Sequence, residues 1–156
     1  MNCRIVPLTE DLIQALAPRI RQSDRNELLA ANGRTDMGEA MRVGLAFSTS
    51  AFAGLADDLP ICAFGVAPAS ILGRQGTPWM IGTPELPSHA LPVLRLSRGV
   101  VANWRDQWPL LVNYVDARNT TSIRWLKWLG FCVMPAQPYG KLGMLFHRFE
   151  MRNAHV

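Results

Sequence analysis

The sequence predicts a mixed α+β or α/β domain, with a central sheet of about six to seven strands flanked by about four helices. Three observations predict this class. Strand-like and helix-like apolar patterns follow one another in the order βααβββαβαββ. Hairpin signals join neighbouring strand-like runs in two places. The stretch 110–131 has the pattern of a buried strand, a capped helix and a Gly-Phe pair that enters another strand.

Composition supports one domain. The 156 residues are 49% hydrophobic and 18% charged, so a core can be buried, and we expect residues 1–151 to form a single domain and residues 152–156 a frayed tail. No apolar run is long enough to span a membrane, and the first residues lack the pattern of a signal peptide. The widely spaced Cys3, Cys62 and Cys132 predict reduced thiols, with Cys62 and Cys132 in the core.

A strand is predicted at 3–8, and the first helix follows it. Thr9 is the expected N-cap of that helix, because its hydroxyl can accept from the first free amides. Pro18 should kink or divide the helix.

Two capping-box spacings follow. Asp24 with Glu27 predicts a further turn or two of helix, and Asp36 with Glu39 precedes a helix at 37–47. Both glutamates are therefore interpreted as capping residues.

The middle of the chain predicts a hairpin and a loop. Strands at 50–56 and 61–66 are separated by the turn residues 57–60. Proline and glycine then mark a loop at 68–78, and a short strand is expected at 79–82.

The next helix is expected to begin after an irregular segment, 83–90. Ser88 is its expected N-cap, and the helix should run to about Trp108. Its inward side would carry Leu94, Val101 and either Trp104 or Trp108, while its outward side would carry Arg95, Arg98 and Arg105.

The C-terminal part begins with a nearly continuous apolar run at 110–115, which is typical of a strand covered on both faces. Asn119 is the expected N-cap of the following helix, and Gly130 its C-terminal stop. Strands are predicted at 131–134 and 144–151, with a turn at 137–143.

This order, together with the run NTTSIRWLKWLGF, resembles the GNAT acyltransferase fold. Asn119, Ser122, the pair Trp125–Leu126 and the pair Gly130–Phe131 stand at the spacings that GNAT proteins use. The resemblance implies that Asn119 would contact the pantetheine arm of acetyl-CoA, and that Arg95 or Arg98 could reach its phosphates.

A narrower resemblance covers residues 60–151. The run NYVDARNTTSIRWLKWLGF, with PWMIGT before it and FHRFEM after it, resembles GNAT-like proteins of short-tailed bacteriophages, including a small internal virion protein. It implies other phage virion proteins as partners, and a location in the host cytoplasm during infection and then in the virion.

The device that binds acetyl-CoA phosphates in GNAT enzymes is missing from the sequence. Such enzymes place a Gly-x-Gly segment before the helix, so that main-chain amides surround the pyrophosphate. Here the segment is IGTPELPSHALP, in which Pro84, Pro87 and Pro92 lack an amide proton and Glu85 adds negative charge.

The proton donor of GNAT enzymes is missing too. It is typically a tyrosine at the position that Leu126 occupies here. Of the two tyrosines in the chain, Tyr114 is expected in the core and Tyr139 in a surface turn. The candidate bases are Glu27, Glu39, Asp116 and His147, and none has a convincing partner in the sequence. No catalytic residue is therefore assigned.

The histidines and the tryptophans bear on two other kinds of site. His89, His147 and His155 are too far apart, and too poor in neighbouring ligands, to predict a metal site. Trp125 and Trp128 lie three residues apart on one helix, and an exposed tryptophan beside Arg124 and Lys127 would suit a protein contact.

These observations leave three hypotheses open. The first is a phage accessory or internal virion protein with a GNAT-like fold, without catalysis or cofactor, that acts through protein contacts. The alternative is an acetyl-CoA-dependent N-acetyltransferase that modifies a host or phage protein amine. A third is weak nucleic-acid contact through the basic part of the chain, since residues 61–156 carry a net charge of +6 and residues 1–60 a net charge of −2.

Overall fold

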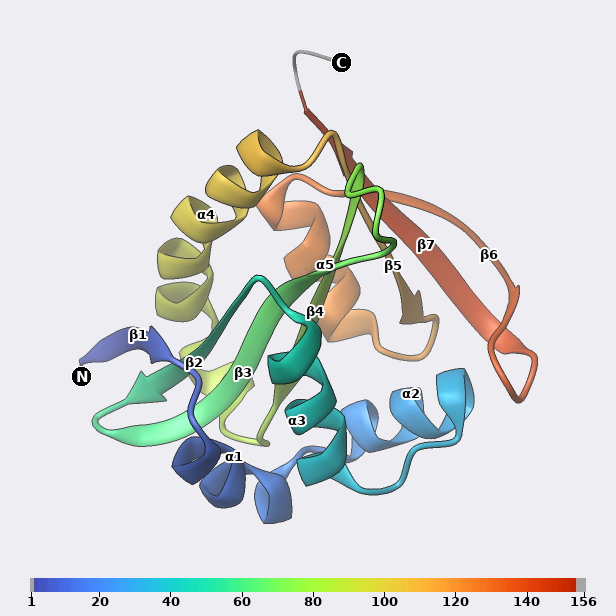
Figure 1. Cartoon of the computed structure of the whole chain (residues 1–156). Helices are drawn as coiled ribbons and strands as arrows, with labels where there is room; N and C mark the ends of the chain where they lie inside the picture. Colours follow the sequence, from blue (N-terminus) through green and yellow to red (C-terminus); the bar gives the residue numbers. More distant parts are fainter. Residues whose placement is uncertain (1, 154–156) are drawn as a thin grey trace.

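The computed structural model describes residues 2–153, which form one seven-stranded sheet with strand order β1-β2-β3-β4-β5-β7-β6. Five α-helices cover it in this part of the chain, α4 and α5 on one face and α1 and α3 on the other (Figure 1). The mixed fold class predicted from the sequence is confirmed. The strands are β1 (Cys3–Pro7), β2 (Ser50–Ala56), β3 (Leu59–Pro68), β4 (Gln75–Gly82), β5 (Leu110–Asp116), β6 (Cys132–Tyr139) and β7 (Met144–Arg152). The helices are α1 (Glu10–Leu16), α2 (Gln22–Asn32), α3 (Met37–Phe47), α4 (Ala90–Gln107) and α5 (Thr120–Leu129).

The N-terminal helices follow the predicted signals in part. Thr9 caps α1 by accepting from the Leu12 amide, and Pro18 divides the helix, since the 3₁₀-helix η1 (Ala17–Arg19) follows α1. Asp36 caps α3 by accepting from the Glu39 amide. For α2 the predicted helix is present, but its predicted start is wrong, because the helix begins at Gln22 and Asp24 already lies within its first turn.

The hairpin of β2 and β3 is confirmed. Asp57 and Asp58 turn the chain with φ values of +46° and +67°, the left-handed region that a two-residue hairpin turn requires. The expected loop at 68–78 is too long, because β4 begins at Gln75 and contains Gly76 and Pro78. Pro78 lies opposite Val66 in β3 and needs no donor toward that strand.

The C-terminal part confirms the central strand and both helix ends. β5 pairs with β4 on one side and β7 on the other, Asn119 caps α5 by accepting from the Ser122 amide, and Gly130 ends it with a φ of +103°. β6 runs on to Tyr139 through two prolines, which an edge strand tolerates.

The cysteines and the chain end were predicted in part. Cys62 is buried, but Cys132 is exposed, because it opens the edge strand β6. Arg152 still belongs to β7, and the Asn153 amide donates to the Pro109 carbonyl. The rest of the expected tail, 154–156, lies outside the described residues.

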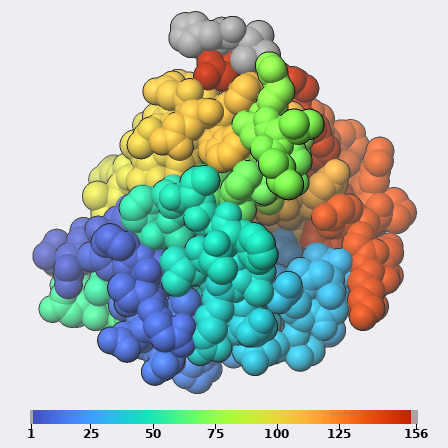
Figure 2. Space-filling view, viewed as in Figure 1, coloured from blue at the N-terminus to red at the C-terminus, as the bar shows by residue number. Residues whose placement is uncertain are grey.

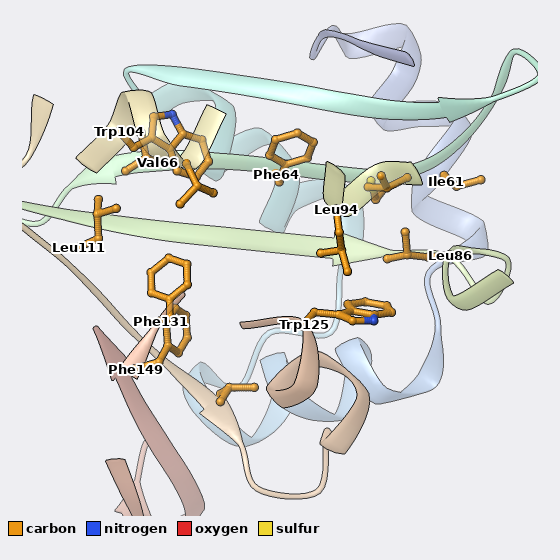
Figure 3. Packing of buried hydrophobic residues seen from close by; sticks show 14 of the residues in the cluster. Ile61, Phe64, Val66, Leu86, Leu94, Trp104, Leu111, Trp125, Phe131 and Phe149 are labelled. Atoms are coloured by element: carbon orange, nitrogen blue, oxygen red, sulfur yellow. The ribbon is translucent and has the colours of Figure 1, made fainter. Parts of the chain in front are cut away.

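Two apolar clusters fill the two faces of the sheet. The larger lies under α4 and α5, where Trp104, Trp125, Phe131 and Phe149 meet side chains of β3 and β5 (Figure 3). The smaller lies under α1 and α3. No helix within residues 2–153 is long and apolar enough to cross a lipid bilayer.

Candidate functional site

The candidate site is the gap where β4 and β5 separate. These parallel strands pair at Gln75 with Leu110 and at Gly76 with Leu111, and beyond these pairs no further pairing is found. A cavity of about 470 Å³ opens between their carboxyl ends, within the size range of small-ligand sites. Figure 2 shows a hollow on the face bounded by α2 (light blue), α3 (cyan) and the β6–β7 hairpin (orange to red).

Both faces of the sheet contribute to the cavity wall. On one side it is lined by Val93, Leu94 and Ser97 of α4 and by Ser122, Trp125 and Leu126 of α5. On the other side it is lined by residues of α2 and α3 and by Trp79 and Tyr139. Two reactants could therefore meet in the gap after approaching from opposite faces.

The edge of β4 presents one open peptide group to the gap. The Thr83 amide donates to the Ile61 carbonyl of β3, so every second residue of β4 must point its N–H and C=O toward β5. Gly82 is already bonded, since its amide donates to Asp24 and its carbonyl accepts from the Arg21 amide. Met80 lies in the middle of the gap, where β5 no longer pairs with it.

The edge of β5 is bonded to side chains. Asn113 bridges the gap, because its Nδ2 donates to the Pro78 carbonyl at 2.7 Å and its Oδ1 accepts from the Tyr114 amide at 2.8 Å. Further along, the Asp116 amide donates to Oε1 of Glu27 at 2.5 Å. Side chains thus replace part of the missing strand ladder.

Glu27 is the carboxyl group that the fold brings into the cavity, not a helix cap. It sits in the middle of α2, half-buried. Burial raises its pKa to about 8, and the nearby charges of Asp24 and Asp116 act in the same direction, while the Asp116 amide opposes them. A carboxyl with such a pKa can take up a proton near neutral pH.

A buried ion pair fixes the wall beside Glu27. The Arg21 guanidinium donates to both carboxylate oxygens of Asp24, at 2.7 and 3.0 Å, and to the Ser122 hydroxyl at 2.8 Å. It also stacks over Trp125, 5.1 Å from the ring centre. This network connects α2, α5 and the end of β4 across the sheet.

Both tyrosines of the chain line the cavity. Tyr114 is half-buried, so its prediction as a core residue is wrong. Tyr139 is exposed as predicted, but it ends strand β6 and does not lie in a turn. Their rings stack at 3.8 Å, and Phe146 packs against Tyr139. Burial raises the pKa of Tyr139, and the neighbouring Tyr114 adds to the effect, so its phenol stays protonated. Leu126 lines the cavity without a proton to donate.

The other candidate bases are engaged elsewhere. Glu39 is exposed on α3. The Asp116 carboxylate pairs with Arg118 at 2.7 Å. Burial raises the pKa of Asp116, but the hydrogen bonds from Arg118 and its charge together outweigh this effect, so the pKa lies below its ordinary value. His147 Nδ1 lies 2.7 Å from the Met134 carbonyl, as expected for a sheet residue. No group of three metal-ligating side chains exists among residues 2–153.

The segment between β4 and α4 does not offer a phosphate cradle. The amides of Thr83, Leu86, Ser88 and Ala90 all donate to main-chain carbonyls, and Leu86 is fully buried against Gly82. Ser88 is not the cap of α4, because it lies within the 3₁₀-helix η2 (Leu86–His89), and His89 occupies the N-cap position of α4, which begins at Ala90.

Glu85 is less of an obstacle to phosphate than its sequence position indicated. It forms an ion pair with Arg19 at 3.3 Å. Its negative charge is therefore partly neutralised within the protein.

The predicted cofactor contacts lie near the helices that flank the gap. Asn119 is buried, and its Nδ2 has no hydrogen-bond partner within the described structure. Arg95 and Arg98 are exposed on α4, and Arg98 stacks over Trp128 of α5 at 4.3 Å. Trp128 is the exposed tryptophan of α5, but its basic partner is Arg98 and not Arg124 or Lys127.

Acetyl-CoA fits this site in part. Its extended arm carries amide groups that suit an open strand edge, and Met80 offers a donor there. The unpartnered Asn119 Nδ2 is buried and does not line the cavity. The bonded amides of the segment 83–90 do not suit its pyrophosphate, so phosphates would depend on exposed side chains such as Arg95.

Sequence comparisons find no relatives of this chain: no protein-family model and no curated protein sequence matches it. Solved structures match over nearly the whole chain. A ribosomal-protein-alanine N-acetyltransferase from Brucella melitensis is 12% identical, with a TM-score of 0.69, covering 96% of this chain and 99% of its own. A GCN5-related N-acetyltransferase from Kribbella flavida is 13% identical, with a TM-score of 0.69, covering 96% and 97%.

A third match is a complex with acetyl-CoA. It is a GNAT superfamily phosphinothricin acetyltransferase from Sinorhizobium meliloti, 11% identical, with a TM-score of 0.71, covering 98% of this chain and 89% of its own. Identities this low establish the architecture alone. The chain therefore has the GNAT acetyltransferase fold.

Proposed function

We propose that this protein transfers an acyl group from a thioester in the gap between β4 and β5 to an amine. The observation that carries the proposal is the position of Glu27, a carboxyl with a pKa of about 8 in a cavity that runs along the open edge of β4. The thioester donor supplies the acyl group. The protein residues supply the base, the polarising donor and the acid.

Glu27 acts as the base in this proposal. An amine is protonated in water at neutral pH and attacks a carbonyl only after it loses a proton. Glu27 in its ionised form accepts that proton, while the Asp116 amide holds its carboxylate in place. The raised pKa makes the ionised form a stronger base than an ordinary carboxylate.

Met80 and Tyr114 supply the other two groups, the polarising donor and the acid. The Met80 amide faces the gap and would donate to the carbonyl oxygen as negative charge develops on it. The phenol of Tyr114, which lines the cavity from β5, takes the role of the acid that Leu126 cannot fill.

Thiol release from acetyl-CoA and from acetyl-pantetheine, measured with a panel of amines, tests the proposal. Glu27→Gln should lower kcat about 100-fold or more, because general-base catalysis typically contributes that much. Glu39→Gln, which changes an exposed glutamate on α3, is the matched control and should leave the rate unchanged. No acyl transfer to any amine in the panel, at millimolar donor, would overturn the proposal.

A second candidate is a non-catalytic role as an accessory or internal protein of a bacteriophage particle, in contact with other virion proteins. The bonded amides of Thr83, Leu86, Ser88 and Ala90 support it, because free amides in this segment would be needed to bind the phosphates of acetyl-CoA. The exposed Ile71 and Leu72, at the tip of the loop between β3 and β4, and the Arg98–Trp128 pair would serve as protein contacts.

Mass spectrometry of purified phage particles tests this second candidate. The chain should be present in the particle, and absent from emptied particles after ejection only if it leaves with the DNA. Absence from the particle rejects the role. DNA binding by the basic part of the chain is tested separately, by measuring the affinity of the purified protein at several salt concentrations.

A further inference from the structure

The acceptor side of the cavity carries an arginine without a partner. Arg34 follows α2, is half-buried and lines the cavity. Its main-chain amide donates to Asn32, but its guanidinium forms no ion pair or hydrogen bond within residues 2–153. A half-buried guanidinium keeps its charge and therefore favours an anionic partner.

Within residues 2–153, the carboxylates around this side of the cavity do not form an ion pair with Arg34. Asp24 is paired with Arg21, and Glu27 is largely uncharged at pH 7 because of its raised pKa. Asp36 caps α3. The side chain of Lys141 passes directly over Gly33 and adds a second positive charge beside Arg34. The acceptor side is thus positive at neutral pH, and a polycationic acceptor would be repelled.

The rest of this wall is apolar or aromatic. Leu28 and Ala31 of α2 and Val43 of α3 line it, together with Trp79 and Tyr139. These surfaces suit an apolar or aromatic body. Glu27 lies within α2 and Arg34 follows the end of that helix, and both residues line the cavity, so one small molecule in the cavity can contact both side chains.

We infer that the acceptor is a small amine that also carries a carboxylate, held by Arg34, with an apolar or aromatic side chain. This inference rests on the proposed acyl transfer and names its acceptor class. In this arrangement the amine lies toward Glu27 and the carboxylate toward Arg34. Apolar amino acids and dipeptides present this chemistry, whereas polyamines and lysine side chains of proteins do not.

Binding to the unmodified chain tests the inference without catalysis. N-acetyl-phenylalanine and N-acetyl-phenylalanylglycine are titrated by calorimetry against N-acetylphenethylamine, which lacks the carboxylate. The carboxylated ligands should bind at least about tenfold more tightly, as expected for a charge-assisted hydrogen bond to a guanidinium. The tighter of the two identifies the amino acid or the dipeptide as the natural length.

Arg34→Gln should remove this preference, and Arg34→Lys should restore part of it. Arg74→Gln is the matched control, since Arg74 is exposed on the loop before β4 and outside the cavity. Equal binding of ligands with and without the carboxylate, or an unchanged preference in Arg34→Gln, overturns the inference.

Failure of the inference and failure of the proposed function look different. If acyl transfer occurs equally well to phenethylamine and phenylalanine, acyl transfer stands and the role of Arg34 is overturned. If the Arg34-dependent preference is found but no amine is acylated, the anion site stands and the proposed function is overturned.

Discussion

The side-chain amide of Asn113 donates to the main-chain carbonyl of Pro78 at 2.7 Å and thereby spans the gap between β4 and β5. The same side chain accepts from the Tyr114 amide, so one residue satisfies a peptide group on each side. The gap is therefore built by side chains and is not simply a place where the sheet fails to close.

Replacing Asn113 should destabilise the fold more than its half-buried position indicates. Asn113→Ala leaves the Pro78 carbonyl and the Tyr114 amide without partners, and each unsatisfied group costs about 1–3 kcal/mol when water cannot replace the bond. We expect the free energy of unfolding in urea to fall by roughly 2 kcal/mol. Asn103→Ala, on the exposed side of α4, should change it by less than about 0.5 kcal/mol. Equal effects of the two substitutions would contradict a bridging role.

Glu27 should make stability depend on pH. Its pKa is about 8 in the folded protein against an ordinary value of 4.5, so folding favours the protonated form. Its contribution is complete below the ordinary value and is lost as pH rises through about 8. The free energy of unfolding of Glu27→Gln, relative to that of the native chain, should therefore rise by on the order of 1–3 kcal/mol between acidic pH and pH 9. Denaturant titrations at several pH values measure this, and a pH-independent difference would refute the shift.

The buried ion pair should be sensitive to the loss of one partner. Arg21→Met leaves the Asp24 carboxylate in the interior with only the Gly82 amide, and breaking a buried pair typically costs about 3–5 kcal/mol. The exposed pair of Arg42 with Glu10 provides the comparison, because Arg42→Met should cost less than about 1 kcal/mol. Thermal unfolding of both variants shows whether the loss of stability depends on the burial of the ion pair or only on the removal of one charge.

Gly82 and Leu86 should show strong coupling. A Cβ atom on Gly82 would lie 2.5 Å from the Leu86 side chain, so Gly82→Ala should cost about 1–3 kcal/mol by overpacking. Leu86→Ala should cost about 2–5 kcal/mol, because Leu86 is fully buried. The double variant should lose less than the sum of the two single variants. Additive losses in a double-mutant cycle would show that the two sites are independent.

Arg95 should matter for acetyl-CoA but not for its shorter analogue. Since the amides of Thr83, Leu86, Ser88 and Ala90 are bonded within the protein, we expect side chains to supply the phosphate contacts. Arg95→Ala should weaken acetyl-CoA binding about fivefold, equivalent to about 1 kcal/mol, and leave acetyl-pantetheine binding unchanged. Arg105→Ala, in the last turn of the same helix, is the control. Equal effects on both ligands would exclude a phosphate contact.

Local signals in the sequence predicted most of the fold. Thr9, Pro18, Asn119 and Gly130 each act through the chain within a few residues of themselves, so their effects on helix ends could be derived without knowing the tertiary structure. The positions of strands inside proline-rich stretches could not. Prolines in β4 and β6 are tolerated because their nitrogen atoms face away from a hydrogen-bonding neighbour, which depends on the finished sheet.

The site was harder to predict than the fold. Asp24 and Glu27 matched a capping box, but Asp24 instead binds the Gly82 amide, 58 residues away, and Glu27 binds that of Asp116, 89 residues away. One signal was available. Asp24, Glu27, Leu28 and Ala31 recur at helical spacing on one face, and an acid on a face that also carries apolar residues indicates a lined cavity.

The short ladder between β4 and β5 leaves the two halves of the sheet joined by few main-chain hydrogen bonds. Strands β1 to β4 and strands β5 to β7 form two blocks that are joined by two residue pairs, Gln75 with Leu110 and Gly76 with Leu111, so the sheet resembles two plates joined along a short hinge. An extended ligand that hydrogen-bonds to Met80 would act as an additional strand between the plates. Binding should then slow amide hydrogen exchange in both blocks at once and join them into a single cooperative unit.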